Sequence, residues 1–255
     1  MIKKIFQTEN IYVIFCNFSR MPYIECDPED FSDKAFFFFE EEKAKKFCES
    51  HKEKKMSLAA VVLPQNALKS FFSALLTDGI DTVCIEDEDI INLPINKIIT
   101  RTLREGVGKP IENPALQLSI MYFLQAVRVA ETDEEKEESR RLEEEMMVNI
   151  ARSIYLVPFT RLDETDENGN QKINLMNLKN KNDEVFIPLF TDLDEFNKIR
   201  PAEKQSAFLP MGFKQIRNTK LNGINGFVIN PGSSNIQLTE QNIAAVDRKF
   251  GDQAR

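Results

Sequence analysis

Two short stretches of the chain repeat one another 144 residues apart, and this repetition constrains the fold more than any other feature. Residues 79–86 read GIDTVCIE and residues 223–230 read GINGFVIN. Three further pairs keep the same order, at offsets of 143 to 150: Ile11–Val13 with Ile154–Leu156, Ala35–Phe39 with Val185–Leu189, and Val62–Pro64 with Phe208–Pro210. Ordered self-similarity of this kind indicates two copies of one structural unit. We therefore predict a tandem duplication.

The second copy has the clearer secondary-structure signals. Strands expected at 154–159, 173–178 and 185–190 form a predicted β-meander, with a tight hairpin turn at Asn168-Gly169. Capping and turn signals predict the later elements: a helix beginning at 191–194, a strand at 206–210, a helix over 212–221, a strand at 227–230 and a terminal helix capped by Thr239. Strands and helices mixed in this way predict an α+β fold with a mixed sheet.

The first copy follows the same plan and is joined to the second by a predicted helical pair. Leu68, Phe72 and Leu75 recur at helical spacing, and the phenylalanine run at 36–39 predicts a strand buried on both faces. Asn113-Pro114 and the capping box at Thr132 begin the two connecting helices. We therefore expect domains at 1–95 and 151–255, with the helical connector at 96–150.

Charge and composition exclude several classes of protein. The net charge is −8 over 255 residues, and nine acids against three bases in residues 131–145 account for −6 of it. This run is typical of the solvated face of an amphipathic helix, and the acidic balance disfavours nucleic acid. The chain has no apolar run long enough to span a membrane and no signal peptide at its start. We expect a cytoplasmic protein, either a monomer or a weak homodimer.

Cysteine and histidine are too few and too scattered for a metal site. The cysteines are Cys16, Cys26, Cys48 and Cys84, with no C-x-x-C pair, and His51 is the single histidine. Cys48 and His51 lie three residues apart, but the segment lacks the glycine-containing loop and third group that would activate a thiol. The sequence thus predicts reduced, structural cysteines, no catalytic residue, no metal and no cofactor.

The second half resembles the SseB family (enhanced serine sensitivity protein B) of bacteria over roughly residues 113–245. Its most specific motifs are VFIPLFTD at 185–192, followed by Phe196, and GFVINP at 226–231. The first half departs from this pattern, because Glu86-Asp87 stands where the second has Asn230-Pro231, so it resembles a degenerate copy. The family's name records a serine-sensitivity phenotype, and the resemblance implies no catalytic residues.

Two groups of residues are candidates for binding. The helix expected at 213–221 carries Lys214, Arg217 and Lys220, which would contact an acidic partner or the acidic run of the same chain. The turn Asn230-Pro231-Gly232 follows a predicted strand, where ligands often bind in α/β sheets, although a tight turn explains the same residues. We therefore expect a non-catalytic protein-interaction or regulatory module with an unknown protein partner. The alternative is an enzyme or metabolite-binding protein of serine or sulfur metabolism.

Overall fold

The chain folds into two compact units, each with its own strands and its own apolar core. The computed structural model describes residues 1–87, 89–100, 109–165, 169, 171–199, 207–219 and 223–254. The N-terminal unit comprises Met1–Lys109 with Pro114–Met146, and the C-terminal unit comprises Pro110–Asn113 with Met147–Arg255. The division falls within one long helix, α6 (Asp133–Arg152). No helix in the described ranges has both the length and the apolar run that crossing a membrane requires.

The N-terminal unit alternates short strands with helices. Its elements before α6 are α1 (Ile2–Gln7), β1 (Asn10–Cys16), β2 (Met21–Pro22), β3 (Ile24–Cys26), β4 (Asp33–Phe38), α2 (Glu41–Ser50), β5 (Leu58–Pro64), a 3₁₀ turn (Gln65–Ala67), α3 (Leu68–Thr77), β6 (Thr82–Glu86), β7 (Ile90–Pro94), α4 (Ile95–Ile98) and α5 (Pro114–Val127).

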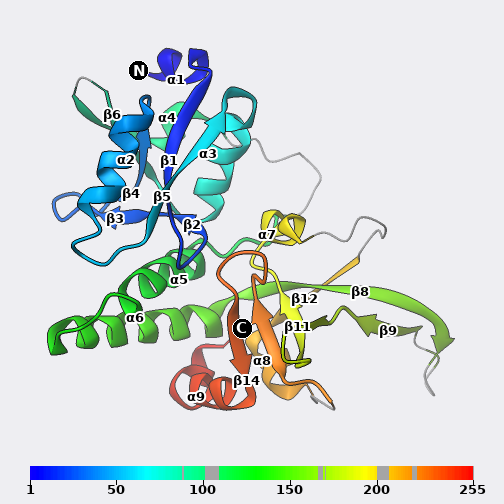
Figure 1. The fold of residues 1–255 in the computed structure, drawn as a ribbon. Helices are drawn as coiled ribbons and strands as arrows, with labels where there is room; N and C mark the ends of the chain where they lie inside the picture. Colours follow the sequence, from blue (N-terminus) through cyan, green and yellow to red (C-terminus); the bar gives the residue numbers. More distant parts are fainter. Residues whose placement is uncertain are drawn as a thin grey trace. The chain divides into compact units, whose positions relative to one another are not determined.

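These strands form one mixed, seven-stranded sheet (Figure 1). β1 pairs antiparallel with β5 on one side and with β2 and β4 on the other. β4 pairs antiparallel with β3 and parallel with β6, and β6 pairs antiparallel with β7. The pairing of β4 and β6 in parallel requires a crossover connection, which α2, β5 and α3 supply.

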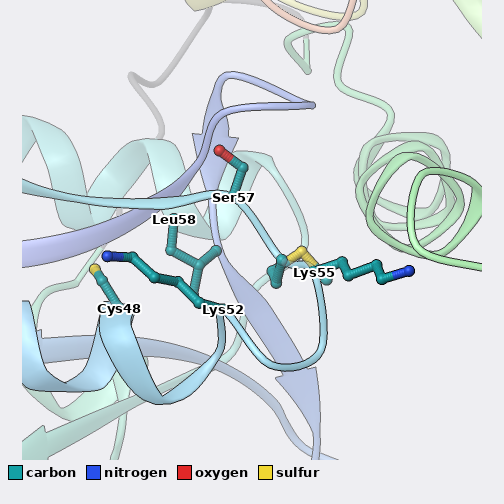
Figure 2. A pocket seen from close by; sticks show the side chains of 6 residues that line it. Cys48, Lys52, Lys55, Ser57 and Leu58 are labelled. Carbon is teal, nitrogen blue, oxygen red and sulfur yellow. The ribbon is translucent and has the colours of Figure 1, made fainter.

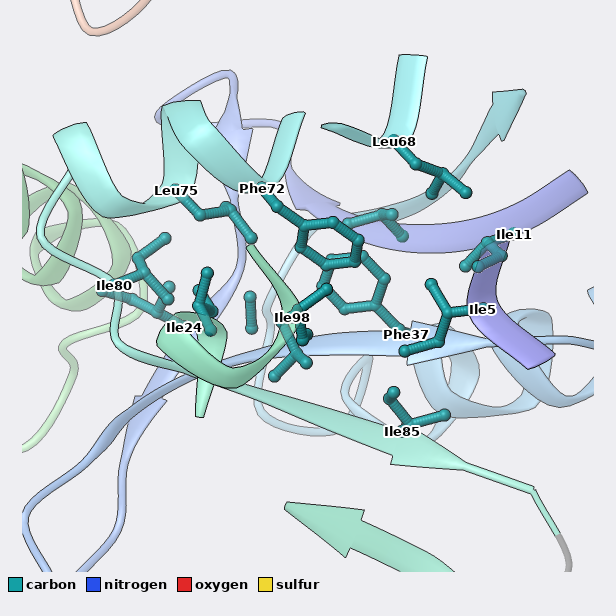
Figure 3. Packing of buried hydrophobic residues seen from close by; sticks show 14 of the residues in the cluster. Ile5, Ile11, Ile24, Phe37, Leu68, Phe72, Leu75, Ile80, Ile85 and Ile98 are labelled. Atoms are coloured by element: carbon teal, nitrogen blue, oxygen red, sulfur yellow. The ribbon is translucent and has the colours of Figure 1, made fainter. Parts of the chain in front are cut away.

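Helices cover both faces of this sheet, and β4 contributes side chains to both. Phe37 stacks on Phe72 of α3, with ring centroids 5.5 Å apart, in the cluster that Figure 3 shows. Phe36 and Phe38 belong to a second cluster on the other face, which includes Ala44 of α2. The prediction that the phenylalanine run is a strand buried on both faces is therefore confirmed for Phe36, Phe37 and Phe38, whereas Phe39 lies just beyond the end of β4.

The C-terminal unit contains the second set of strands. Its elements after α6 are β8 (Ile154–Thr165), β9 (Gln171–Leu175), β10 (Leu178–Lys179), β11 (Val185–Leu189), α7 (Leu193–Lys198), β12 (Ala207–Gly212), α8 (Phe213–Asn218), β13 (Gly226–Ile229), β14 (Ile236–Thr239), α9 (Glu240–Phe250) and a 3₁₀ turn (Gly251–Gln253).

The strand pairings of this unit follow the same order as those of the N-terminal unit. β8 pairs antiparallel with β9 and β12, and the bridge between Leu156 and Phe190 links it to β11. β11 pairs antiparallel with β10 and parallel with β13, which pairs antiparallel with β14. The correspondence is one to one. In the order of pairings, β8 takes the position of β1, β11 that of β4, and β12 that of β5, while β13 and β14 take those of β6 and β7.

The α+β class is confirmed, whereas the predicted meander is wrong in part. β9 does pair with β8, but the third strand, β11, pairs with β10 and β13 instead of β9. The helix expected to start at Thr191 begins after Asp192, whose carboxylate accepts the N–H of Glu195. The turn residue Asn168, the strand residue Ser206 and the helix end at 220–222 lie outside the described residues. The tandem duplication and its domain boundaries stay predictions.

Candidate functional site

A cluster of buried polar side chains lies where the parallel strands β11 and β13 of the C-terminal unit end. The two ends meet because Leu189 and Ile229 are paired in register. The buried polar residues that follow these ends are Thr191, Asp192, Glu195, Asn230, Ser233 and Ser234. Carboxyl ends of parallel strands are a common place for ligand sites. The contacts of this cluster therefore bear on whether Asn230, Pro231 and Gly232 bind a ligand, as the sequence predicts.

Asn230 joins the two strand ends through its side-chain amide. Its Oδ1 accepts the backbone N–H of Thr191 at 3.1 Å, and its Nδ2 donates to the Thr191 hydroxyl at 2.9 Å. The residue is fully buried and its φ is +47°, in the left-handed region that asparagine tolerates better than most residues. The backbone carbonyl of Asn230 accepts N–H bonds from Ser233 and Asn235, each at 3.0 Å. Asn230 therefore closes the turn and holds it to β11.

Two carboxylates of the cluster are held by neighbours in the same unit. Thr191 donates its hydroxyl to Asp192 at 2.8 Å, and burial raises the pKa of Asp192 despite this bond. Glu195, which is 1% exposed, accepts the Ser233 hydroxyl at 2.6 Å and pairs with the Lys198 ammonium at 2.5 Å. Buried carboxylates need such partners because desolvation alone is costly.

The loop after β13 packs closely on α7. A Cβ added to Gly232 would meet Ile199 Cγ2 at 2.8 Å and Lys198 Cβ at 3.0 Å, so glycine is required by the close approach. Pro231 beside it is half-buried. Among the described residues, the Ser234 hydroxyl is the buried side-chain polar atom that has no hydrogen-bond partner. These contacts give the loop a structural role, and ligand binding at Asn230, Pro231 and Gly232 stays a prediction.

The cationic helix predicted from the sequence is α8, and its central arginine already has a partner. Lys214 and Arg217 are exposed, and Lys220 lies outside the described residues. The Arg217 guanidinium forms an ion pair with Asp247 of α9, so its partner is in the same unit and is not the acidic run at 131–145. A partner-binding role for Lys214, Arg217 and Lys220 stays a prediction.

Cys48 and His51 do not act as a pair in the described contacts. The His51 Nδ1 lies 2.8 Å from the Phe47 carbonyl oxygen, and the imidazole ring stacks on Phe47 at 4.3 Å. The other ring nitrogen lies 3.5 Å from a Glu25 carboxylate oxygen. Burial raises the pKa of the Cys48 thiol, which keeps it protonated and weakly nucleophilic.

A row of backbone groups along β5, in the N-terminal unit, faces away from the rest of the sheet. Asn17 donates its N–H to the Ser57 carbonyl at 2.9 Å, and Gln65 donates to Glu9 at 3.0 Å, which fixes the alternation of bonds between β1 and β5. Because bonded and non-bonded pairs alternate in an antiparallel ladder, Leu58, Ala60 and Val62 direct their N–H and C=O groups outward. These groups have no hydrogen-bond partner within the described ranges.

The corresponding strand of the C-terminal unit, β12, has a blocked edge. Leu156 and Phe190 exchange N–H···O bonds at 2.8 and 3.0 Å, so the same alternation makes Phe208, Pro210 and Gly212 the outward residues of β12. Pro210 has no N–H to offer. The Gly212 N–H is taken by the Gln215 side chain at 3.0 Å. Two of the three outward donors of β12 are thus removed, whereas β5 keeps the donors of Leu58, Ala60 and Val62 and lacks only that of its last residue, Pro64.

A pocket of about 260 Å³ opens at the start of β5 (Figure 2). It is lined by Cys48, Lys52, Lys55, Met56, Ser57 and Leu58. Figure 2 shows the Lys52 side chain ending beside the sulfur of Cys48, while Lys55 extends in the opposite direction. Lys55 forms an ion pair with Glu131, and Lys52 has no ion pair within the described part of the chain. The pocket therefore presents one uncompensated ammonium next to the open edge.

Comparison with a family model covers α6 and most of the C-terminal unit that follows it. Residues 127–245 match the family model of the SseB protein N-terminal domain. The resemblance to the SseB family is confirmed. The SseB match begins at the last residue of α5 rather than at the expected residue 113 and ends within α9, so β1 to β7 lie outside it.

Other comparisons add little to the SseB match. No curated protein matches the chain. Two solved structures are similar at 11% sequence identity. One is Anabaena Tic22 (protein transport), with a TM-score of 0.24 and coverage of 83% of this chain and 82% of that chain. The other is Tic22 from Plasmodium falciparum, with a TM-score of 0.23 and coverage of 100% of this chain and 99% of that chain.

Sequence reasoning missed the β5 edge and the pocket beside it. The signal was present in the strand itself, LAAVVLP at 58–64, which has no charged residue to discourage pairing. Only residues 62–64 of this strand entered the sequence predictions, as one of the paired segments that indicate a tandem repeat. The SseB match does not reach this region, so a family comparison does not indicate it either.

Proposed function

We propose that the protein is a non-catalytic interaction module that binds an extended segment of another protein by strand addition at β5. The observation that carries this proposal is the outward row of N–H and C=O groups at Leu58, Ala60 and Val62. Unpaired strand edges bind extended chains because each added residue pair supplies main-chain hydrogen bonds.

The side chains of β5 support pairing rather than prevent it. Proteins protect exposed edges with lysines, prolines, bulges or covering elements. The strand has a single such feature, Pro64 at its end, and it exposes Val61 by 41% and Val62 by 50%. β-branched side chains on an edge favour a β partner. β12 lacks two of its three outward donors, whereas β5 lacks only the donor of Pro64, which supports β5 as the open edge.

The alternative role, in serine or sulfur chemistry, lacks comparable support. It requires an activated nucleophile, and the Cys48 thiol has a raised pKa and no contact with the His51 ring among the described hydrogen bonds. We therefore favour binding of a protein over chemistry on a metabolite.

We further propose that the two units are tandem copies, of which the first retains the binding edge. The shared order of strand pairings supports this, as do the repeated stretches at 79–86 and 223–230, which place β6 and β13 at the same position in their units. Divergence of one copy is expected when only one keeps a given contact surface.

A charge placed on the edge tests the proposed function. Val62→Lys introduces the side chain with which proteins protect edges, and Val62→Thr is the matched control, because it keeps the β-branched shape. Tagged full-length protein would be used to capture partners from native cells, and the captured protein would be purified and rebound. We expect stoichiometric binding to wild type and Val62→Thr and loss of binding to Val62→Lys, with equal melting temperatures. Undiminished binding to Val62→Lys would overturn strand addition at β5.

A further inference from the structure

The pocket at the start of β5 lies next to the open edge. We propose that the β5 edge and Lys52 together bind the C-terminal segment of a protein partner, with the segment antiparallel to β5 and its terminal carboxylate at the Lys52 ammonium. This inference rests on the proposed function and adds the partner's chemistry and direction to it.

The length of the open edge sets the length of the segment. Leu58 to Val62 spans four residue steps, about 13 Å at the usual rise of a strand. Three outward residues offer three N–H and three C=O groups, which matches a partner segment of about five residues. The pocket is lined by Ser57 and Leu58, so it continues directly from the end of this row.

Charge selects the direction of the segment. A segment antiparallel to β5 runs from Val62 toward Leu58 and brings its C-terminus to the pocket. A parallel segment would bring an N-terminal ammonium to the same place, where Lys52 would repel it. No acidic residue lines the pocket, and Lys52 is the lysine there without an ion pair in the described ranges. A terminal carboxylate is therefore the complementary group.

The size of the pocket suits the terminal residue of a chain and is below the range for drug-sized ligands. Pockets for drug-sized ligands measure about 300–1,000 Å³, and this one is about 260 Å³. The Leu58 and Met56 side chains provide apolar lining, so a small apolar terminal residue fits beside the lysine. The exposed Val61 and Val62 favour β-branched residues further along the segment.

Labelled peptides and the full-length protein test this inference. The probes are a fluorescein-labelled heptapeptide of alternating valine and threonine with a free C-terminus, its C-terminal amide, and two versions N-methylated at alternate positions. Binding is measured by fluorescence anisotropy. We expect the amide to bind at least ten-fold more weakly than the free acid. N-methylation should abolish binding in one alternation and spare it in the other, because only every second amide faces β5.

Protein variants assign the effect to Lys52. Lys52→Gln should bind acid and amide equally, and Lys54→Gln, an exposed lysine that does not line the pocket, should keep the discrimination. Equal binding of acid and amide to wild type would overturn carboxylate recognition and leave strand addition standing. Absence of binding by every peptide would overturn the inference as a whole, while the Val62→Lys capture experiment decides the proposed function separately.

Discussion

The side chain of Asn230 bonds both the backbone N–H and the hydroxyl of Thr191, at 3.1 and 2.9 Å, and so ties the end of β13 to the end of β11. These two residues are 39 positions apart in the sequence and both are fully buried. The bonds replace the strand pairing that stops at Leu189 and Ile229. They give the Asn230 amide and the buried groups of Thr191 hydrogen-bond partners, which makes Asn230 a residue on which the stability of the C-terminal unit depends.

Removal of the Asn230 side chain should destabilise the protein strongly. Asn230→Ala leaves buried groups of Thr191 without partners, at about 1–3 kcal/mol, and forces alanine into the left-handed region, at about 1–2 kcal/mol more. Asn230→Gly suffers only the first loss, because glycine adopts positive φ freely. Urea denaturation should therefore rank wild type above Asn230→Gly and Asn230→Gly above Asn230→Ala. Equal stability of the two variants would show that the backbone conformation contributes nothing.

Asp192 should make stability fall as pH rises. Burial is the main cause that raises its pKa above the ordinary value of 3.8. A raised pKa means that the folded state holds this proton more tightly than the unfolded state. The stabilisation that protonated Asp192 gives to the folded state is therefore fully present below pH 3.8, and it is lost as pH rises through the folded-state pKa of Asp192. Asp192→Asn keeps a good N-cap for α7 and should remove this dependence. Urea midpoints from pH 3.5 to 7 check it, and parallel profiles for both proteins would contradict it.

The two glycines of the second repeat should differ in their tolerance of alanine. Both have positive φ, +72° at Gly223 and +149° at Gly226. A Cβ at Gly226 would collide with the Leu238 carbonyl oxygen of β14, whereas a Cβ at Gly223 would meet no atom within 4 Å among the described residues beyond its chain neighbours. Gly223→Ala should thus cost about 1–2 kcal/mol, and Gly226→Ala should cost more or prevent folding. Thermal unfolding by circular dichroism measures both, and an equal loss would refute the steric argument.

Reversal of the Arg217 charge on α8 should lower the stability of the free protein, whether or not a partner is present. The sequence predicts that Arg217 contacts an acidic partner or the acidic run of the same chain, but its ion pair with Asp247 gives this residue a role within the C-terminal unit. Because both side chains are partly exposed, Arg217→Glu should cost no more than about 1 kcal/mol. The double variant Arg217→Glu with Asp247→Arg should recover most of this loss, since it restores opposite charges. Unchanged stability in the single variant would mean that the pair contributes nothing.

Local signals in the sequence predicted α3, α6 and α9, whereas α1 and α4 were not predicted. α3 follows from the spacing of Leu68, Phe72 and Leu75, and α9 begins where Thr239 caps it, with its hydroxyl accepting the Asn242 N–H. The capping box at Thr132 is also present, because Glu135 and Thr132 bond each other's N–H groups. These patterns depend on residues within one or two turns of each other, so a single sequence reveals them.

Strand partners were harder to predict, because pairing joins residues that are distant in the sequence. β10 and β14 are only two and four residues long and gave no clear alternation. The repeat alignment set Ala35 against Val185, whereas the parallel pairs Ala35–Val83 and Ile187–Phe227 set Ala35 against Ile187. A shift of two residues keeps every side chain on the same face, so hydrophobicity alone does not distinguish the two registers.

The candidate sites show the same limit. Sequence reasoning named Asn230 for its place after a strand, but its hydrogen-bond partner Thr191 follows a different strand, so only the fold shows that the two residues meet. It missed β5, because the outward direction of Leu58, Ala60 and Val62 depends on their register with β1. Whether a strand lacks a neighbour on one side depends on the pairing of the whole sheet, which the residues of that strand do not reveal by themselves.

Amide hydrogen exchange along β5, measured by NMR on the full-length protein, tests the central claim most directly. In the free protein the outward amides of Leu58, Ala60 and Val62 should exchange at least about ten-fold faster than those of Ala59, Val61 and Leu63, which face β1. Addition of the valine–threonine peptide with a free C-terminus should protect the outward three and leave the others unchanged. Outward amides already protected in the free protein, or unprotected with the peptide bound, would contradict strand addition at this edge.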